Sequence, residues 1–264
     1  MTRELNAILT IALRDFTKLI RDRFRLLISF VFPIIFIGAL GTSLQSNIGK
    51  FIEFNYLTFT FTGVLAQTLF QSTAAGIISL IQDRENDFSQ EMFVSPISRY
   101  SIIIGKILGE SLVSMVQAVG VLIFGLFIAL FFAIDITLYQ LLISLPAVFA
   151  ACLLGGAFGV FVMAAIGNQR SANQLFPFVI FPQFFLAGVF NPIKELPLPI
   201  WILSRMAPMT YAVDFFRGLY YWGHPDYDSV VLYHPALDLL IISVLFVIMM
   251  SAGTYLFVRN ERNR

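Results

Sequence analysis

Six long runs of apolar residues dominate this chain, and each is close to the length that crosses a lipid bilayer. A helix rises about 1.5 Å per residue and the hydrocarbon core is about 30 Å thick, so a crossing needs about 20 apolar residues. All backbone amides and carbonyls must pair within the chain in lipid, and the runs do not alternate as barrel strands do. We therefore expect six transmembrane helices, at residues 26–44, 57–81, 107–133, 138–166, 175–190 and 237–258.

The composition agrees with this expectation. Only 12% of the residues are charged and 58% are hydrophobic, whereas a soluble domain has about 25% charged residues. Such a chain could not cover its own surface with polar groups in water, so we predict an all-α membrane protein. The fifth run is the shortest and contains Pro177 and Pro182, which predicts a kinked helix that ends at a shallow depth.

The positive charges predict the orientation. If the six runs alternate in direction, one side of the membrane receives 13 of the 17 Lys and Arg residues and the other side receives 4. Positively charged loops stay in the cytoplasm. Both termini are therefore expected to be cytoplasmic, and the number of crossings to be even.

Residues 1–25 form a separate N-terminal segment. Its apolar residues recur at i, i+3, i+4 and i+7, and its basic residues lie off that stripe, as in an amphipathic helix that lies in the membrane interface. A helix packed on the bundle is the alternative. A cleaved signal peptide is disfavoured, because the basic stretch is long and the next apolar run is long enough to span.

No motif of a soluble enzyme is present. The chain lacks a phosphate-binding G-x-x-x-x-G-K-[ST] loop, HExxH and GxSxG. His224 and His234 each precede a proline, which favours turn residues over metal ligands, and Cys152 lies in an apolar run as a small buried side chain would. We expect no catalytic residue, metal or cofactor in this chain. The scarcity of acids within the spans also disfavours an ion-driven carrier.

Uncharged polar residues are the remaining candidates for a substrate pathway. Gln67 and Gln71 are four residues apart and share one helix face, and Gln183 lies among phenylalanines. An unpaired amide in lipid is costly, so these side chains should face another helix or a cavity. Helix contact and substrate pathway both remain open. The candidate pathway residues are Gln67, Gln71, Phe181, Gln183 and Phe184.

Two glycine pairs, Gly105 with Gly109 and Gly155 with Gly159, would allow close approach of helices.

The connection at residues 82–106 is the most specific part of the chain. Charged residues crowd directly after the second span, Pro96 ends a short helix, and Ser98 can cap the next one. A short charged helix held between two membrane helices can be pushed by a partner protein, and a solvated loop is the alternative. The candidate residues are Asp83, Arg84, Glu85, Asp87, Glu91, Phe93 and Pro96.

Two motifs resemble the permease subunits of type-2 ABC exporters. The first is the series Asp83-Arg84-Glu85, Glu91, Ser95-Pro96, Arg99 and Gly105-Lys106, and the second joins residues 188–192, 196–197, 208–211 and 217–218. The resemblance covers nearly the whole chain and is closest to the daunorubicin-resistance branch of drug exporters. Residues 86–89 depart from the usual Gly-Thr segment, which leaves the shape of the short helix open.

The resemblance implies a single transmembrane domain over residues 1–264 without its own ATPase site. Two permease copies would pair, most simply as a homodimer, and each would bind a separate ABC ATP-binding subunit that carries ATP and Mg²⁺. The helix around residues 85–95 would dock on that subunit. The segment 191–236 would form re-entrant outer helices, with motif residues Gly188, Pro192, Pro197, Pro208, Tyr211 and Arg217.

The function that the resemblance implies is export of an amphiphilic or hydrophobic, drug-like or lipid-like substrate across a bacterial plasma or inner membrane. An ion-driven secondary carrier and a membrane assembly factor are the alternatives, and no nucleic acid is expected as a partner. Phenylalanine-rich spans favour amphiphilic cargo, although phenylalanine also faces lipid generally.

Overall fold

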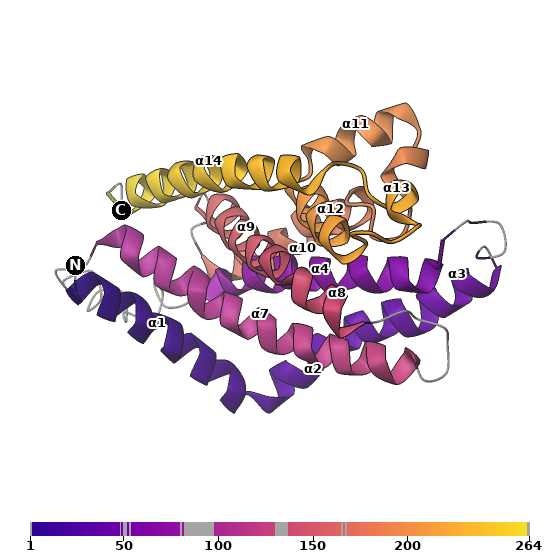
Figure 1. The fold of residues 1–264 in the computed structure, drawn as a ribbon. Coiled ribbons are helices and arrows are strands. Elements are labelled where there is room, and N and C mark those ends of the chain that lie inside the picture. Colours follow the sequence, from indigo (N-terminus) through magenta and orange to yellow (C-terminus); the bar gives the residue numbers. More distant parts are fainter. Residues whose placement is uncertain are drawn as a thin grey trace.

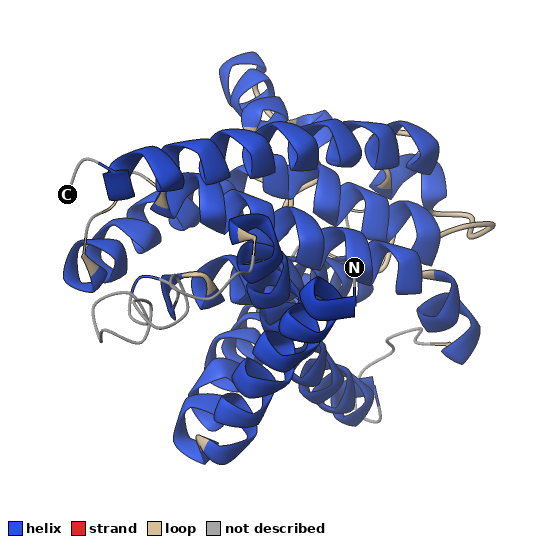
Figure 2. Ribbon diagram, turned by 90° about the vertical axis from the view of Figure 1, so that its left-hand side faces the viewer, coloured by secondary structure: helices blue, strands red, loops and turns tan. Residues whose placement is uncertain are grey.

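The computed structural model describes residues 2–47, 49, 52, 54–79, 81, 98–129, 137–164, 166 and 168–262, and these residues form helices, turns and loops without a strand (Figure 2). The helices are α1 (Thr2–Arg21), α2 (Arg23–Ile34), a π-helical segment (Ile35–Gly41), α3 (Thr42–Asn47), α4 (Tyr56–Gly76), α7 (Arg99–Ala129), α8 (Leu138–Ile143), α9 (Leu145–Met163), α10 (Gln169–Leu186), a 3₁₀ turn (Ile193–Glu195), α11 (Leu198–Met206), α12 (Pro208–Tyr220), α13 (Tyr227–Val230) and α14 (Pro235–Arg262).

The long helices run side by side in one bundle. Helix α1 begins, and α14 ends, at the same end of the molecule, where α7 also begins (Figure 1). This arrangement agrees with the expectation that both termini lie on one side.

Four stretches are long and apolar enough to cross a membrane by length and composition: Leu27–Asn47, Tyr100–Phe127, Leu145–Met163 and Tyr227–Leu256. They coincide with the first, third, fourth and sixth expected spans. The second and fifth expected spans are present as helices α4 and α10. Helix α4 is rich in Thr and Gln, and α10 begins with the polar segment 169–174, so neither reaches the same average hydropathy.

Several helix bounds differ from the expected spans, and local capping explains two of them. Helix α7 starts at Arg99, within the expected loop 82–106, because the Ser98 hydroxyl accepts a hydrogen bond from the Ser101 amide at 3.3 Å. Helix α10 starts at Gln169, because the Asn168 side chain accepts from the Ser171 amide at 2.7 Å. The predicted Ser98 cap is confirmed.

Proline interrupts two of the long helices. Pro33 lies in the last turn of α2, and the chain continues as a π-helical turn, which restores backbone pairing where the proline lacks an amide hydrogen. The fourth expected span breaks at Ser144 into α8 and α9, because Pro146 fits only the first turn of a new helix.

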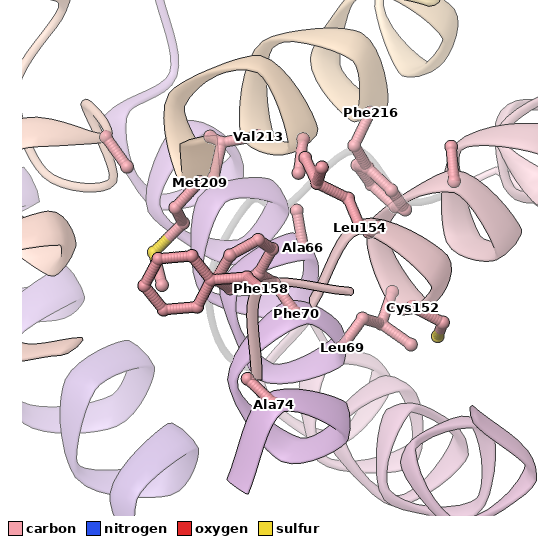
Figure 3. Packing of buried hydrophobic residues seen from close by; sticks show 14 of the residues in the cluster. Ala66, Leu69, Phe70, Ala74, Cys152, Leu154, Phe158, Met209, Val213 and Phe216 are labelled. Atoms are coloured by element: carbon pink, nitrogen blue, oxygen red, sulfur yellow. The ribbon is translucent and has the colours of Figure 1, made fainter. Parts of the chain in front are cut away.

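Helix α4 lies at the centre of the core, between α7, α9 and α12. Figure 3 shows Phe70 of α4, Phe158 of α9 and Met209 of α12 meeting there. A Cβ atom on Gly155 would lie 2.3 Å from the Phe70 carbonyl oxygen, and one on Gly159 would lie 2.6 Å from that of Ala74. The predicted close approach at this glycine pair is confirmed.

Helix α1 packs along the first half of α7 (Figure 1). A Cβ atom on Gly105 would lie 3.0 Å from the Ile8 carbonyl oxygen, and one on Gly109 would lie 3.0 Å from the Ala12 Cα, so the second glycine pair also brings two helices together. A different row of α1, at Leu5, Leu9 and Leu13, is exposed. The apolar residues of α1 therefore serve two surfaces, one packed on the bundle and one free to contact lipid.

The segment between α10 and α14 holds the short helices α11, α12 and α13. Helix α12 is buried along almost its whole length. Helix α11 exposes apolar side chains instead, among them Leu198, Leu203 and Met206.

Candidate functional site

A groove of about 340 Å³ opens among α2, α4 and α7. Its volume falls within the range of small-molecule sites, about 300–1,000 Å³. A wider hollow of about 820 Å³ lies over residues 168–174, but one helix end alone forms it. The groove among three helices is therefore the candidate site.

One wall of the groove is polar. It consists of Thr68, Gln71 and Ser72 from α4 and Gln117 from α7. The Gln67 amide nitrogen donates to the Gln71 carbonyl oxygen at 2.6 Å, which leaves the Gln71 amide nitrogen without a partner among the described residues. Gln117 is 7% exposed, and its amide has no hydrogen-bond partner in the described part of the chain. The wall therefore offers unused hydrogen-bonding capacity in an otherwise apolar bundle.

The part of the lining on α2 is mostly apolar: Ile28, Phe32 and Pro33 lie there beside Ser29, and Ala75 of α4 adds another apolar side chain. The Phe32 ring meets the Phe184 ring edge to face, with centroids 5.4 Å apart. Because Phe32 lines the groove and also contacts Phe184, the groove adjoins an aromatic cluster. This cluster is formed by Phe32, Phe36, Phe184 and Phe190.

The five predicted pathway residues do not converge on one cavity within the described chain. Gln71 lines the groove, Gln67 is hydrogen-bonded to it, and Phe184 borders it through Phe32. The Gln183 carbonyl oxygen instead accepts from the Met209 amide at 3.4 Å, and the Phe181 side chain is exposed. A pathway role for each of them stays a prediction.

A buried ion pair joins α1 to α7 near the start of α7. Lys106 Nζ lies 2.9 Å from Asp15 Oδ2, with Lys106 1% exposed and Asp15 5% exposed. Arg14 Nε lies 3.5 Å from the other oxygen of Asp15. The Glu4 carboxylate accepts from the Ser98 amide at 3.2 Å. These contacts hold α1 against the helix that directly follows the charged loop.

Sequence reasoning noted Lys106 only as part of a Gly-Lys motif and did not foresee its pairing with Asp15. A lysine between apolar residues of one long helix is a signal that a partner charge is near. Gln117 lies within the third expected span, and only the packing of α7 against α4 reveals its place on the groove.

The predicted coupling residues Asp83, Arg84, Glu85, Asp87, Glu91, Phe93 and Pro96 lie outside the described residues. The structure describes only the helices at the two ends of their loop, α4 and α7.

Arg217 joins the segment between α10 and α14, which the sequence predicts to be outer, to the rest of the bundle. Its guanidinium is 3% exposed, and it donates to the carbonyl oxygens of Gly188 at 2.7 Å, Phe59 at 3.0 Å and Val189 at 3.2 Å. The guanidinium carbon lies 3.6 Å from the centre of the Phe59 ring. Burial lowers the pKa of Arg217 to about 10, so the group stays protonated at neutral pH. One side chain thus joins α12, α4 and the turn after α10.

Two glycines make room for this contact. A Cβ atom on Gly63 would lie 2.5 Å from an Arg217 nitrogen and 2.9 Å from the Val189 carbonyl oxygen. Gly188 has a φ of +71°, a backbone conformation that side chains disfavour, and this turn aims its carbonyl oxygen at Arg217.

The other residues of the outer motif set helix ends. Pro192 and Pro197 directly precede the 3₁₀ turn and α11, and Pro208 is the first residue of α12, a position where a missing amide hydrogen costs nothing. The Tyr211 hydroxyl donates to the Arg205 carbonyl oxygen at 2.7 Å. The predicted motif residues therefore lie together in one outer segment.

Two buried carboxyl groups lie beside this segment. The Asp214 oxygens accept from the Leu232 and Tyr233 amides at 2.8 and 2.7 Å, and the Asp238 carboxyl lies within hydrogen-bonding reach of Asp214. Burial raises the pKa of Asp214 to about 6, against the opposing effect of Arg217 and Lys194. Asp238 is fully buried and has no donor partner among the described residues, so one proton shared by the two carboxyls would pair them.

The two histidines behave as turn residues. His224 Nδ1 accepts from the Asp226 amide and His234 Nδ1 accepts from the Ala236 amide, each at 3.2 Å. The described residues contain no cluster of three or more metal-ligating side chains. Cys152 is buried against Ser114, with Sγ and Oγ 3.2 Å apart.

Comparisons with known proteins agree with this architecture. The chain is 26% identical to “Putative transport permease ycf38” of Cyanophora paradoxa over 212 residues, which is 78% of this chain and 71% of that protein. It is 28% identical to “Inner membrane transport permease YadH” of Escherichia coli over 185 residues, 67% of this chain and 68% of that protein.

A third relative is “Probable multidrug ABC transporter permease YbhR” of Escherichia coli, 25% identical over 145 residues, which is 54% of this chain and only 38% of that protein. The sequence profile of the family described as “ABC-2 type transporter” matches residues 6–221, from α1 through the Arg217 segment. Because that match covers most of the chain, the protein belongs to the ABC-2 type transporter family and is a membrane permease subunit.

Proposed function

We propose that this permease moves an amphiphilic or hydrophobic substrate out of the cytoplasm or the inner leaflet, driven by a separate ATP-binding subunit. Two copies of the chain pair, and each copy rests on one ATPase. Residues 85–95 form the contact with that ATPase, and closure of the ATPase pair opens the pathway outward. The ATP and Mg²⁺ belong to the partner, since this chain carries no phosphate-binding loop.

The topology that we propose has six crossings, with α4 and α10 as the second and fifth and both termini in a bacterial cytoplasm. The polar residues of α4 are compatible with a crossing because α4 is enclosed by other helices. Helices α11 and α12 then form a re-entrant outer segment. The resemblance of the sequence motifs to daunorubicin-resistance exporters and the relative YbhR, named as a probable multidrug permease, support a drug-export branch.

The contact between α1 and α7 is the structural observation that best supports this proposal. Helix α7 directly follows the charged loop, and the buried Lys106–Asp15 pair ties its first turns to α1. A displacement of the loop would therefore move two helices together rather than unwinding the end of one. This is the arrangement that a push from a partner protein requires.

Purification of the tagged chain from its native membrane, followed by mass spectrometry, tests the partnership. We expect a separate chain with a phosphate-binding loop to co-purify. Glu85→Gln and Glu91→Gln should each lower ATP hydrolysis of the complex and export, because they remove charges at the proposed contact.

Glu195→Gln is the matched control, since Glu195 is an exposed glutamate in the outer segment. It should leave hydrolysis and export unchanged. Full activity of both loop variants would refute the coupling role of residues 85–95. Transport that collapses with an uncoupler while ATP is held constant would identify an ion-driven carrier instead.

A further inference from the structure

We infer that the groove among α2, α4 and α7 binds the head of the exported cargo, and that this cargo is an amphiphile with an uncharged, hydrogen-bonding head. The inference rests on the proposed export function and narrows its substrate class.

The absence of charge in the lining argues for an uncharged head. None of the nine described residues that line the groove is acidic or basic. A charged head that entered it would lose hydration without gaining a counter-ion, at a cost of several kcal/mol. The phosphate of an ordinary phospholipid head falls under the same penalty, so a resident bilayer phospholipid is a poor occupant.

The unused amides argue for a head that forms hydrogen bonds. Gln117 is buried, faces the groove and has no partner in the described chain. Gln71 has its carbonyl oxygen occupied by Gln67 and its amide nitrogen open. A carboxamide both donates and accepts, so hydroxyl or amide groups on the cargo would satisfy these side chains.

The apolar wall argues for a hydrocarbon chain attached to that head. Ile28 and Phe32 line the groove and are 53% and 37% exposed. A chain leaving the groove would run over these side chains towards lipid. The polar wall on α4 and α7 and the apolar wall on α2 thus match the two ends of one amphiphile.

Photo-labelling of the complex in nanodiscs, with no nucleotide added, tests the inference. The full-length complex, as it purifies, is exposed to a monoacylglycerol whose acyl chain carries a diazirine. Two matched probes carry the same chain on a phosphate head and on a trimethylammonium head. We expect the monoacylglycerol to label peptides of α2, α4 and α7 in preference to both charged probes, and unlabelled monoolein to compete.

Two variants locate the site. Gln117→Leu removes the buried amide at similar volume and should lower labelling about tenfold, the effect of one good hydrogen bond of about 1.4 kcal/mol. Ala75→Trp should block the groove and abolish labelling. Gln174→Leu, an exposed glutamine on α10, is the control and should label like the wild type. Size-exclusion profiles and melting temperatures establish that each variant is folded.

Equal labelling by all three probes, or labelling that survives Ala75→Trp in folded protein, would overturn the inference. Absent labelling together with a changed oligomeric state in Ala75→Trp would identify a second copy of the chain as the occupant, which also overturns it. Labelling of the groove that fails to stimulate ATP hydrolysis would identify a bound bilayer component instead of cargo. A preparation without an ATP-binding chain would refute the proposed function and leave the labelling result intact.

Discussion

The two halves of α4 use polar contacts in opposite ways. At the outer half, Arg217 reaches in from α12 and donates to the carbonyl oxygen of Phe59 on α4 and to two carbonyls of the turn after α10. At the other half, Gln71 faces a groove with an open amide nitrogen, and Gln117 faces it from α7. Near Arg217 the guanidinium and the carbonyl oxygens that it contacts are hydrogen-bonded within the chain, whereas polar groups in the groove remain available for a ligand.

This contrast predicts the largest loss for Arg217→Leu. The change removes four hydrogen bonds from a charged donor, one to the Thr62 hydroxyl and three to buried carbonyl oxygens. We therefore expect the free energy of unfolding to fall by about 4 kcal/mol or more. Fluorescence-detected size exclusion should show little folded protein. Arg170→Leu, at an exposed arginine of α10, is the control, and wild-type stability in Arg217→Leu would break the contrast.

The Lys106–Asp15 pair tests whether strongly stabilising polar contacts are confined to the region of Arg217 or also occur between α1 and α7. Lys106→Met should cost about 3 kcal/mol, because it removes the closer of the two cations beside the buried Asp15 carboxylate and leaves only Arg14, at 3.5 Å. The double variant Lys106→Met with Asp15→Leu should recover much of that loss. Detergent-unfolding curves of the wild type, Lys106→Met, Asp15→Leu and the double variant measure the coupling free energy. Strictly additive losses of stability would mean that the two groups do not interact.

The buried carboxyls predict a pH effect at the outer segment. The pKa of Asp214 is raised in the folded state to about 6, so the folded protein holds the proton more tightly than the unfolded chain does. Stability should therefore rise as pH falls through about 6 and level off below the unfolded pKa of about 4. The Leu232 amide, Arg217, Asp238 and Lys194 all oppose the increase in the pKa of Asp214 that burial causes.

The Asp238→Asn variant distinguishes this pH effect from the titration of other acidic residues. The new amide can donate to Asp214, so the variant should be more stable than wild type at pH 7.5 and lose most of the difference near pH 5. Melting temperatures across that range measure it. Parallel curves for both proteins would show that the pair does not share a proton.

The smallest stability effect should come from the groove. Gln117→Leu should change the free energy of unfolding by less than about 1 kcal/mol, since its amide is unpaired in the described chain and burial of a leucine is favourable. Gln71→Leu should cost about 1–2 kcal/mol, because it removes the acceptor of the buried Gln67 amide nitrogen. A loss above about 2 kcal/mol would mean that these glutamines act as helix contacts. This measurement decides between the two interpretations that the sequence leaves open.

The long helices could be predicted from sequence because hydropathy acts locally, whereas the motif that contains Arg217 is identified only by its resemblance to type-2 ABC permeases. The proline of α12, the turn at Gly188 and the cap at Ser98 all depend on near neighbours in the chain. The partners of Arg217 could not be predicted, because Phe59 lies 158 residues away in sequence. No local pattern indicates which carbonyl oxygens a guanidinium will contact.

The groove shows the same limit. Gln67 and Gln71 share a face by spacing alone, but their place beside Gln117 and Phe32 depends on how α2 and α7 pack against α4. The lower hydropathy of α4 does not exclude the expected second span, because its Thr and Gln residues are compatible with a helix enclosed by others rather than one facing lipid.

ATP hydrolysis by the complex with its ATPase partner, measured in nanodiscs against rising monoolein, tests the central claim most directly. The account predicts stimulation in wild type and loss of stimulation in the double variant Gln71→Leu with Gln117→Leu. Equal stimulation of wild type and double variant, or no response to monoolein alongside a response to a charged amphiphile, would contradict it.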